Sequence, residues 1–288
     1  MKKLSVIAVV RNDNYGVYLN DRLICFFKSI EMCPYDIDLI LVEWNPPANT
    51  KSFYDEYKDI LPKNKTIKII TVPNELHEGI KNSNHFNVFE YYAKNCGLRH
   101  VETEYVLFTN PDDIFVESVW HDIHNNLTPQ TYLRIHRADL LHKNIEFKNM
   151  SVQEIISSLT YFRIHEWIPN LSADDILLGN YPEEQPIFEN ASGDFICAKT
   201  SECIDFGGFD EASTYSHFDS WFVRKLWHNQ SNQIVLKGLI YHIHHQRPNI
   251  ETAEKKNLYT SLHYSEHKNP SDWGLLNKTL IYQTIAKT

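Results

Sequence analysis

Polar side chains that could hold a metal ion follow an apolar run at residues 106–109. The run is β-branched and aromatic, which is typical of a buried strand, and Pro111 cannot continue its hydrogen-bonded ladder. Asn110, Asp112 and Asp113 are therefore expected at the carboxyl end of that strand, the edge where ligands bind in an open α/β sheet. Adjacent carboxylates repel each other unless a positive charge lies beside them, and a hard divalent cation carrying a phosphorylated substrate meets that need. The structural alternative is a turn in which these residues only cap the next segment.

A second group of candidate ligands is the histidine cluster at residues 241–247, which reads Tyr-His-Ile-His-His-Gln-Arg. In a strand, His242 and His244 share one face and His245 takes the other, so at most two could reach one metal ion without a bend. A polar strand end with partly exposed imidazoles is the alternative. A hydrolytic zinc site is not favoured, because the chain has no His-Glu-x-x-His motif and its cysteines lack ligand spacing.

Other reaction classes lack their motifs in this chain. No Gly-x-Ser-x-Gly elbow occurs, and no glycine-rich phosphate loop follows the first apolar run. Because the chain has only 9 glycines in 288 residues, we expect phosphate binding to depend on a metal ion and on side chains.

The composition is that of a globular protein with a large core, with 42% hydrophobic and 23% charged residues. The formal net charge of -9 argues against nucleic acid as the partner. The 5 cysteines show no CxxC pair and are odd in number, so a reducing cytoplasm is the expected compartment. The apolar run at residues 4–10 is too short for a signal peptide, and no stretch reaches the length of a membrane span.

The elements that must position the candidate ligands follow a βαβ pattern in the first half of the chain. Helical spacing of apolar residues predicts helices at residues 19–32 and 86–98. Short apolar runs predict strands at residues 4–10, 37–42, 66–72 and 105–109. This alternation indicates an α/β fold with a mainly parallel sheet flanked by helices. Because the carboxyl ends of parallel strands meet at one edge, residues 11–13 and Glu43 are expected near Asp112.

The regular alternation is lost after about residue 116. A helix is predicted near residues 151–162, followed by a loop that ends near residue 188. Long irregular segments of this kind are usually lids or binding loops. A second structured block is expected over residues 193–241.

The tail contains Trp273, which opens a helical spacing of apolar residues that includes Leu276, Leu280 and Ile281. We expect this segment to pin the tail to the body, with membrane or partner binding as the alternative. No linker marks a domain boundary, so we expect one elaborated domain at residues 1–250 and a packed helical tail at residues 251–288.

Several short motifs occur in a defined order along the chain. They are the first strand through Arg11, Glu43-Trp44-Asn45-Pro46-Pro47, Ala93-Lys94-Asn95-Cys96-Gly97, Asn110-Pro111-Asp112-Asp113, Gly193-Asp194-Phe195, Gly207-Gly208-Phe209 and His217-Phe218-Asp219-Ser220. This order resembles a glycosyltransferase of the GT-A fold and is most similar to the large family-2-like group. The resemblance spans roughly residues 4–250. It implies a Rossmann-like, nucleotide-sugar-binding half at residues 1–115 and an acceptor-binding half at residues 116–250.

The metal motif of this family is Asp-x-Asp, and Asn110-Pro111-Asp112 matches it with an amide in the first place. Asn still offers an oxygen but brings no charge, so weaker metal binding is expected, unless Asp113 compensates. Many metal-dependent members contribute a late histidine, which implies His245, in preference to His242, as a further ligand. The ion in the family, Mn²⁺ or Mg²⁺, bridges the diphosphate of the nucleotide-sugar and offsets the charge on the leaving group.

The resemblance also implies a donor pocket. Glu43 matches an acid that faces the nucleobase or ribose, and Lys94, in a stretch similar to Ala-Arg-Asn-x-Gly, could reach the diphosphate. A surface acid and a solvated helix lysine are the alternatives. The residues expected to bind the donor are Arg11, Asn12, Asp13, Glu43, Lys94, Asn95, Asn110, Asp112 and Asp113.

Two carboxylates are expected to be catalytic. Asp219 matches the base of inverting members, which accepts the proton of the acceptor hydroxyl while the sugar carbon is attacked from the opposite face. It also opens a helical pattern, so an N-cap is the alternative. Asp194 follows Gly193, which lets the backbone come close, and is expected to face the acceptor or the donor sugar.

The expected activity is a metal-assisted, inverting glycosyltransferase of the hexosyltransferase type. The donor is expected to be UDP-linked, and the acceptor to be a hydroxyl of a carbohydrate or of a lipid-linked molecule, with polysaccharide biosynthesis as the setting that the family implies. One alternative is a sugar nucleotidyltransferase, which would usually need a glycine-rich basic loop after the first strand. The other is a non-catalytic relative that binds carbohydrate or nucleotide-sugar, an alternative suggested by Asn110. Donor sugar, acceptor and oligomeric state stay open.

Overall fold

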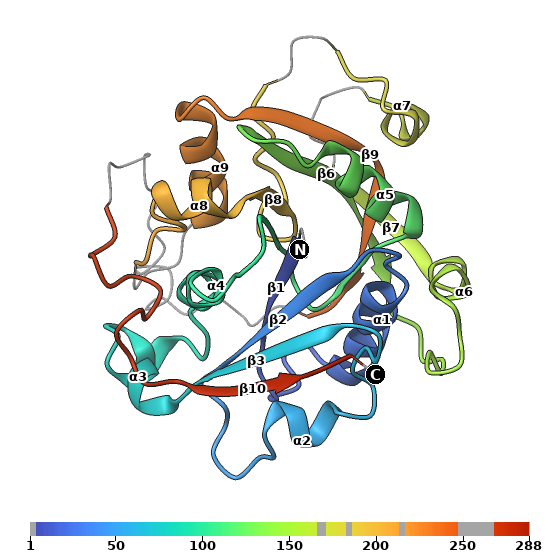
Figure 1. Ribbon diagram of the computed structural model, residues 1–288. Helices are drawn as coiled ribbons and strands as arrows, with labels where there is room; N and C mark the ends of the chain where they lie inside the picture. Colours follow the sequence, from blue (N-terminus) through green and yellow to red (C-terminus); the bar gives the residue numbers. More distant parts are fainter. Residues whose placement is uncertain (1–3, 166–170, 183–185, 213–216, 247–267, 288) are drawn as a thin grey trace.

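The computed structural model describes residues 4–165, 171–182, 186–212, 217–246 and 268–287 (Figure 1). Within these residues, ten strands form one continuous mixed sheet. The strand order is β10-β3-β2-β1-β4-β8-β6-β9-β5, and β7 pairs with β6. The α/β class expected from the sequence is confirmed. Both halves of the chain contribute to the same sheet, and their division into a donor half and an acceptor half stays a prediction.

The strands and helices have the following bounds. The strands are β1 (Leu4–Val10), β2 (Ile37–Trp44), β3 (Thr66–Val72), β4 (Tyr105–Phe108), β5 (Asp113–Ile114), β6 (Thr131–Leu141), β7 (Thr160–His165), β8 (Ile196–Lys199), β9 (Asn232–His244) and β10 (Ile281–Ile285). The helices are α1 (Leu19–Glu31), α2 (Phe53–Tyr57), α3 (Asn74–Glu78), the 3-10 helix η1 (Ser83–His85), α4 (Glu90–Leu98), α5 (Glu117–Asn126), α6 (Val152–Ser158), α7 (Ala173–Leu178), α8 (Thr200–Asp205) and α9 (Phe218–His228). In the described ranges, none of these helices has both the length and the apolar character that a membrane crossing requires.

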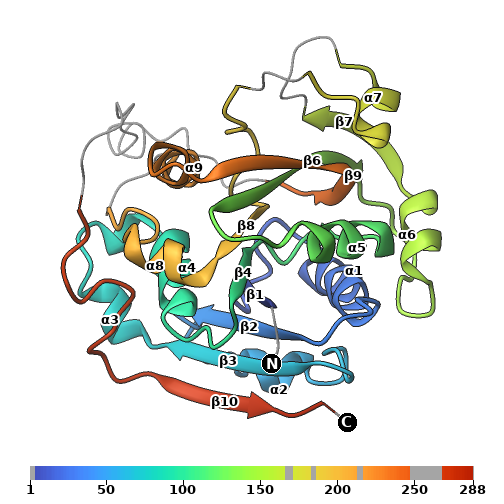
Figure 2. The same cartoon turned by 45° about the horizontal axis from the view of Figure 1, so that its top comes forward.

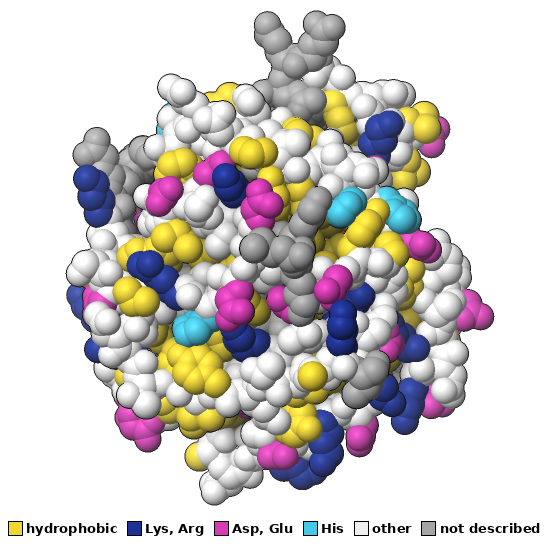
Figure 3. Space-filling view, in the orientation of Figure 1, with side chains coloured by type: hydrophobic (Ala, Val, Ile, Leu, Met, Phe, Trp, Pro, Cys, Tyr) yellow, Lys and Arg dark blue, Asp and Glu magenta, His cyan; other side chains and the backbone are white. Residues whose placement is uncertain are grey.

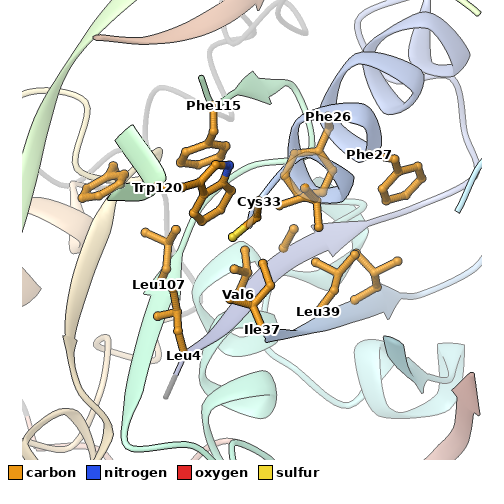
Figure 4. Packing of buried hydrophobic residues seen from close by; sticks show 14 of the residues in the cluster. Leu4, Val6, Phe26, Phe27, Cys33, Ile37, Leu39, Leu107, Phe115 and Trp120 are labelled. Carbon is orange, nitrogen blue, oxygen red and sulfur yellow. The ribbon is translucent and has the colours of Figure 1, made fainter. Parts of the chain in front are cut away.

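Strands β3, β2, β1 and β4 pair in parallel, as the sequence predicted. Their side chains alternate between two faces, and both faces are buried under helices. On one face, Val6 packs in a cluster with Phe26 of α1 and Trp120 of α5 (Figure 4). On the other face, Ile7 packs in a cluster with Ala93 of α4 and Phe222 of α9. The carboxyl ends of these strands are thereby held at one rigid edge.

Strand β6 was missed by the sequence patterns, although it has 11 residues. Its buried side chains include Arg134, Arg137 and Asp139, so it does not read as an apolar run. It pairs in parallel with β9 and antiparallel with β7 and β8. These pairings carry charged side chains into the interior next to the edge where β4 ends.

The helix predicted at residues 151–162 is shorter than expected, because α6 ends at Ser158. A capping box between Ser151 and Glu154 marks its start. Thr160, Tyr161 and Phe162 then begin β7, which pairs with β6. The prediction of a helix as far as residue 162 was wrong, since β-branched and aromatic residues that find a partner strand favour the extended form.

The helix expected in the tail is absent from its described part. Residues 251–267 lie outside the described residues, and Ile281–Ile285 form β10, which pairs antiparallel with β3 at the edge of the sheet (Figure 2). Its β-branched residues favour a strand once the edge of β3 offers hydrogen bonds. Trp273 packs as predicted: it is 7% exposed, and the guanidinium carbon of Arg99 lies 3.6 Å from the centre of its ring.

Candidate functional site

Pairing of β5 with β9 creates the candidate site. Asp113 lies opposite His242 in this antiparallel pair, and the N–H of Ile243 donates to the carbonyl of Asp112 (3.1 Å). The turn after β4 is thereby fixed against the end of β9, although the two segments are far apart in the sequence. Strand β9 ends at His244, so His245 lies outside the strand. The alternation of side chains between two faces therefore does not keep His245 away from His242.

Asp112, His242 and His245 form the group that the sequence predicted to hold a metal ion. Oδ2 of Asp112 lies 2.9 Å from Nε2 of His245 and 3.5 Å from Nε2 of His242. One ligand atom from each residue lies within 4.8 Å of the others. We call these three residues the trio. One carboxylate and two imidazoles are a donor set that suits a divalent first-row metal ion.

The surroundings of the trio fit a metal ion in two respects. Oδ1 of Asp112 is buried without a hydrogen-bond partner, which leaves a lone pair for a cation. Nδ1 of His242 lies 3.1 Å from Oδ1 of Asp139, so its Nε2 faces the trio. Histidines that bind metals usually make such a second contact with a carboxylate. Arg22 also lies close, with Nη1 3.1 Å from Oδ2 of Asp112, and adds a fixed positive charge.

The charges around the trio keep Asp112 ionised. Burial alone would raise the pKa of Asp112, but His242 and His245 hold this pKa well below its usual range. Burial alone would lower the pKa of His242, but Asp112, and then Asp139 and Asp113, raise it to about 10. Because imidazole binds metals only in its neutral form, a cation at the trio would replace the proton of His242.

Asn110 occupies the first place of the metal motif, but its side chain is engaged inside the protein. Its Nδ2 donates to Oδ1 of Asp194 (2.8 Å), and its Oδ1 accepts from Nζ of Lys94 (3.0 Å). The oxygen that was expected to reach a metal ion therefore meets an ammonium group. An aspartate at position 110 would place its carboxylate next to that of Asp194, and the two would repel each other. This repulsion is a physical reason for an amide at this position.

Lys94 and Asn95 hold the surrounding loops. Besides its contact with the Asn110 amide, the buried ammonium of Lys94 donates to Oε1 of Glu90 (2.6 Å) and to the carbonyl of Gly193 (2.6 Å). All three of its donors are therefore used. The buried Asn95 amide accepts from the N–H of Phe209 (2.9 Å) and donates to its carbonyl (2.8 Å). Lys94 is 0% exposed, so the alternative of a solvated helix lysine is wrong, and a contact between Lys94 and the diphosphate stays a prediction.

Asp113 is the first residue of β5, directly after the turn, and is fully buried. Its Oδ2 accepts from Oγ1 of Thr109 (3.1 Å) and from the N–H of Asn110 (3.2 Å). Burial, and then the charges of Asp194 and Asp112, raise the pKa of Asp113 well above its usual range. A role for Asp113 as a metal ligand stays a prediction, with its Oδ2 already engaged by Thr109 and by the N–H of Asn110.

Glu43 is 1% exposed, so the alternative of a surface acid is wrong. Its Oε1 accepts from the N–H of Phe53 (2.7 Å) and its Oε2 from Oγ1 of Thr71 (2.8 Å). These contacts tie the end of β2 to β3 and to the first residue of α2. A contact between Glu43 and the nucleobase stays a prediction.

Arg11, Asn12 and Asp13 lie at the carboxyl end of β1, as predicted, and are partly exposed. Nε of Arg11 donates to the carbonyl of Asn45 (2.6 Å), and its guanidinium pairs with Asp13. Oδ1 of Asn12 accepts from the hydroxyl of Tyr57 (3.2 Å). The loop after β1 is thereby joined to the segments that follow β2, and these three residues keep polar surface that a donor could use.

Asp219 lies in the first turn of α9, but the N-cap of that helix is His217. The alternative of an N-cap is therefore wrong. Oδ2 of Asp219 accepts from the N–H of Gly193 (2.8 Å). A Cβ at Gly193 would lie 3.4 Å from the same oxygen, which shows how closely the backbone approaches.

Asp194 connects the Asp219 side of the site to the trio. Its carboxylate forms a buried ion pair with Arg137 and accepts from Asn110. Asp194 follows Gly193 in the chain, so one short path runs from Asp219 through Gly193 and Asp194 to the turn that carries Asp112. Both oxygens of Asp194 are engaged by these contacts, and a contact between Asp194 and a sugar stays a prediction.

Three charged residues of the site were missed by the sequence analysis. Arg22 and Arg137 are 2% and 4% exposed, and Asp139 is 0% exposed. Each lies on an element that is otherwise largely apolar, α1 or β6. A charge at a buried position is rare unless it is paired, so a charge inside such a run was the available signal.

The loop between β1 and α1 covers His245 with a strained backbone. Asn14, Gly16, Val17 and Tyr18 all have positive φ, at 51°, 69°, 61° and 53°. A β-branched residue such as Val17 pays a steric cost in this conformation. Strain of this kind persists at functional sites where the surrounding structure holds it in place.

Replacing Gly16 with alanine is expected to weaken metal binding. A Cβ at Gly16 would collide with Nδ1 of His245 and come within 2.8 Å of the carbonyl of Gln246. We expect Gly16→Ala to lower Mn²⁺ affinity about 10-fold or more, as measured by electron paramagnetic resonance in the presence of UDP. The control is Gly207→Ala, which has φ +80° and meets no described atom within 4 Å. Both variants carry about 1 kcal/mol of backbone strain. An equal loss of Mn²⁺ affinity in the two variants would therefore show that the contact with His245 is not the cause.

No protein-family model and no curated protein sequence matches the chain. The fold is similar to that of TarS from S. aureus. A crystal structure of TarS 1-349 in complex with UDP-GlcNAc matches with a TM-score of 0.52 and 17% identity, over 87% of this chain and 61% of that chain. The chain has the GT-A fold. The fold predicted from the order of motifs is therefore confirmed.

A second TarS structure gives the same TM-score of 0.52 at 16% identity, over 84% of this chain and 37% of that chain. The GT-A chain described here thus spans less than two thirds of the TarS chains that it matches. A further crystal structure of TarS 1-349 contains UDP and matches with a TM-score of 0.51. This likeness establishes the fold, and the activity is argued from the site.

Proposed function

We propose that the protein is a metal-assisted, inverting glycosyltransferase that uses a nucleotide-sugar. The observation that carries the proposal is the trio at the carboxyl edge of a GT-A sheet, joined through Asn110 and Asp194 to Asp219. A cation ligand set and an anchored carboxylate base in one site are what such a transfer requires. The UDP and UDP-GlcNAc in the similar TarS structures support a UDP-linked donor.

In this proposal, Asp112, His242 and His245 hold Mn²⁺ or Mg²⁺. When bound, the ion offsets the negative charge that develops on the departing nucleoside diphosphate. Asp219 accepts the proton of the acceptor hydroxyl as that oxygen attacks the sugar carbon from the face opposite the diphosphate. The N–H of Gly193 fixes the carboxylate of Asp219 for this step.

The experiment that tests this proposal is calorimetric titration with UDP, GDP and CDP, each with and without Mn²⁺. We expect one nucleotide to bind in a metal-dependent manner, and Asp112→Asn to reduce that binding at least about 10-fold. The control is Asp210→Asn, because Asp210 is also buried and ion-paired, with Lys225 on α9. Binding of no nucleotide by the wild type would overturn the proposal.

A second candidate function is a non-catalytic relative that binds nucleotide-sugars. It is favoured by the contacts of Asn110 and Lys94, which occupy each other and leave neither free for a donor phosphate. Donor binding with no transfer or hydrolysis, measured by release of UDP over several hours, would support this function over the first.

The proposed setting is the cytoplasm, where nucleotide-sugar donors are made. All five cysteines are buried and free, which agrees with a reducing compartment. On the face shown in Figure 3, basic and acidic side chains are interspersed, which gives nucleic acid no extended basic surface there. We propose a carbohydrate or lipid-linked acceptor.

A further inference from the structure

The charged residues behind the trio centre on Asp139, which contacts His242 of the trio and two arginines. Asp139 is fully buried on β6 and lies beside His242 in the parallel register of β6 and β9. Its Oδ1 lies 3.1 Å from Nδ1 of His242, and its Oδ2 accepts from Nε of Arg163 (2.7 Å). Nε of Arg137 forms a further ion pair at 3.1 Å from Oδ1. Contacts on three sides hold this carboxylate in one orientation.

A β-bulge brings one of these partners into place. The pairing of β6 with β7 shifts register between Asp139 and Leu140, so that Arg163 lies opposite Asp139. A bulge re-aims the side chains next to it, and bulges are frequent beside functional sites. The side chain of Arg163 is 48% exposed, so it reaches Asp139 from the surface. The buried carboxylate therefore has a cation on the side away from His242.

The contact with Asp139 decides which nitrogen of His242 faces the trio. An imidazole has two distinct nitrogens, and the hydrogen bond made by one sets the state of the other. Here Nδ1 faces Asp139 and Nε2 faces Asp112 at 3.5 Å. With its proton on Nδ1, His242 presents the lone pair of Nε2 to a cation at the trio. Without Asp139, ring rotation or the other tautomer would withdraw that lone pair.

We propose that Asp139 is a positioning residue that fixes His242 as a metal ligand through the Nδ1 hydrogen. This role rests on the proposed metal-dependent function. It makes Asp139 a determinant of metal affinity that does not itself touch the ion or the substrate. Second contacts of this kind typically contribute 10–100-fold to metal affinity.

The test is a double-mutant cycle on Mn²⁺ affinity, measured by electron paramagnetic resonance with saturating UDP. We expect Asp139→Asn to weaken Mn²⁺ binding about 10–100-fold. In a His242→Ala background, in which Asp112, His245 and the diphosphate still hold the ion, we expect Asp139→Asn to have no further effect. Thermal unfolding in EDTA monitors the fold of each variant, and Asp210→Asn controls for loss of a buried, ion-paired carboxylate elsewhere.

The outcomes separate this role from the function on which it rests. If the wild type fails to bind Mn²⁺ with UDP, the metal-dependent function is overturned, and this role falls with it. If the wild type binds and Asp139→Asn binds equally well, only the role of Asp139 is overturned. An equal loss in both backgrounds would mean that Asp139 acts on the fold in general, which also overturns the role.

A measurement on the wild type keeps the proposal testable if Asp139→Asn does not fold. Cd²⁺ is diamagnetic and accepts imidazole ligands, so it can replace Mn²⁺ for ¹⁵N nuclear magnetic resonance of histidine-labelled protein. With Cd²⁺ and UDP, we expect His242 to carry a slowly exchanging proton on Nδ1 and none on Nε2. A proton on Nε2 would overturn the proposal.

Discussion

Replacing Asp219 with asparagine is expected to lower the turnover of sugar transfer by about 10²–10⁴-fold. The amide keeps the size of the side chain and can still accept from the N–H of Gly193, but it cannot take a proton from the acceptor hydroxyl. Binding of UDP and Mn²⁺ should be unchanged, because Asp219 contacts none of the trio in the described contacts. The measurements are steady-state turnover with a responsive acceptor and calorimetric titration of UDP with Mn²⁺.

The control for this prediction is Glu189→Gln. Glu189 also packs its carboxylate against α9, through an ion pair with Arg224 at 2.8 Å, but it has no place in the proposed chemistry. Turnover within a few-fold of wild type is expected for the control. Equal turnover of Asp219→Asn and wild type would show that Asp219 is not the base.

Replacing Asn110 with aspartate is expected to destabilise the protein, although it restores the Asp-x-Asp motif of the family. Nδ2 of Asn110 donates to Oδ1 of Asp194 at 2.8 Å, and an aspartate would replace that hydrogen bond with repulsion between two carboxylates. The loss of this hydrogen bond leaves Oδ1 of Asp194 without its donor. The free energy of unfolding should therefore fall by about 1–3 kcal/mol at neutral pH. Mn²⁺ affinity should not increase, since Lys94 still occupies the neighbouring oxygen.

The loss in Asn110→Asp should depend on pH in a defined direction. Repulsion raises the folded-state pKa of the carboxyl pair above its unfolded value, so the pair is tolerated at low pH and loses stability as the pH rises through the raised pKa. The difference from wild type should therefore shrink as the pH falls toward about 4. Chemical denaturation across this range measures it, and a difference that grows on acidification would contradict the explanation.

A matched control for the Asn110 variant is Asn95→Asp. Nδ2 of Asn95 also donates to a carboxylate, Oε1 of Glu211, at 3.0 Å. The two variants therefore introduce the same kind of repulsion, one at the partly buried amide of Asn110 and the other at the buried amide of Asn95. Both should lose stability, but only the Asn110 variant alters a residue that touches Asp194 beside the proposed site.

Much of the parallel half of the fold could be predicted from local patterns. The predicted strand at residues 4–10 coincides with β1, and that at residues 66–72 coincides with β3. All residues of β1 are buried, and β3 keeps four buried apolar residues, so each run can be recognised without knowledge of its partner strands. Strand β6 could not be found in this way, because Arg134, Arg137 and Asp139 break its apolar pattern. Those charges are tolerated because other segments supply partners: carbonyl and hydroxyl oxygens for Arg134, Asp194 for Arg137 and Arg163 for Asp139.

The members of the site were predicted better than their roles. Asp112, His242 and His245 were predicted as ligands and lie together. Asn110 and Lys94 were predicted to bind the donor, which stays a prediction, and in the structure they are hydrogen-bonded to each other. Residue type indicates which chemistry a side chain can do, but its hydrogen-bond partners decide which chemistry is left to it.

The sequence by itself determined the α/β class, the edge of the sheet where polar residues gather, and the identity of the candidate ligands. These depend on hydrophobic periodicity and on the ends of strands, which are local properties of the chain. Only the tertiary structure decided that β5 pairs with β9, that Asp139 faces His242 and that the Asn110 amide is engaged by Lys94. The physical reason is that the register of strands far apart in sequence is set by the packing of the whole sheet, and no local pattern encodes it.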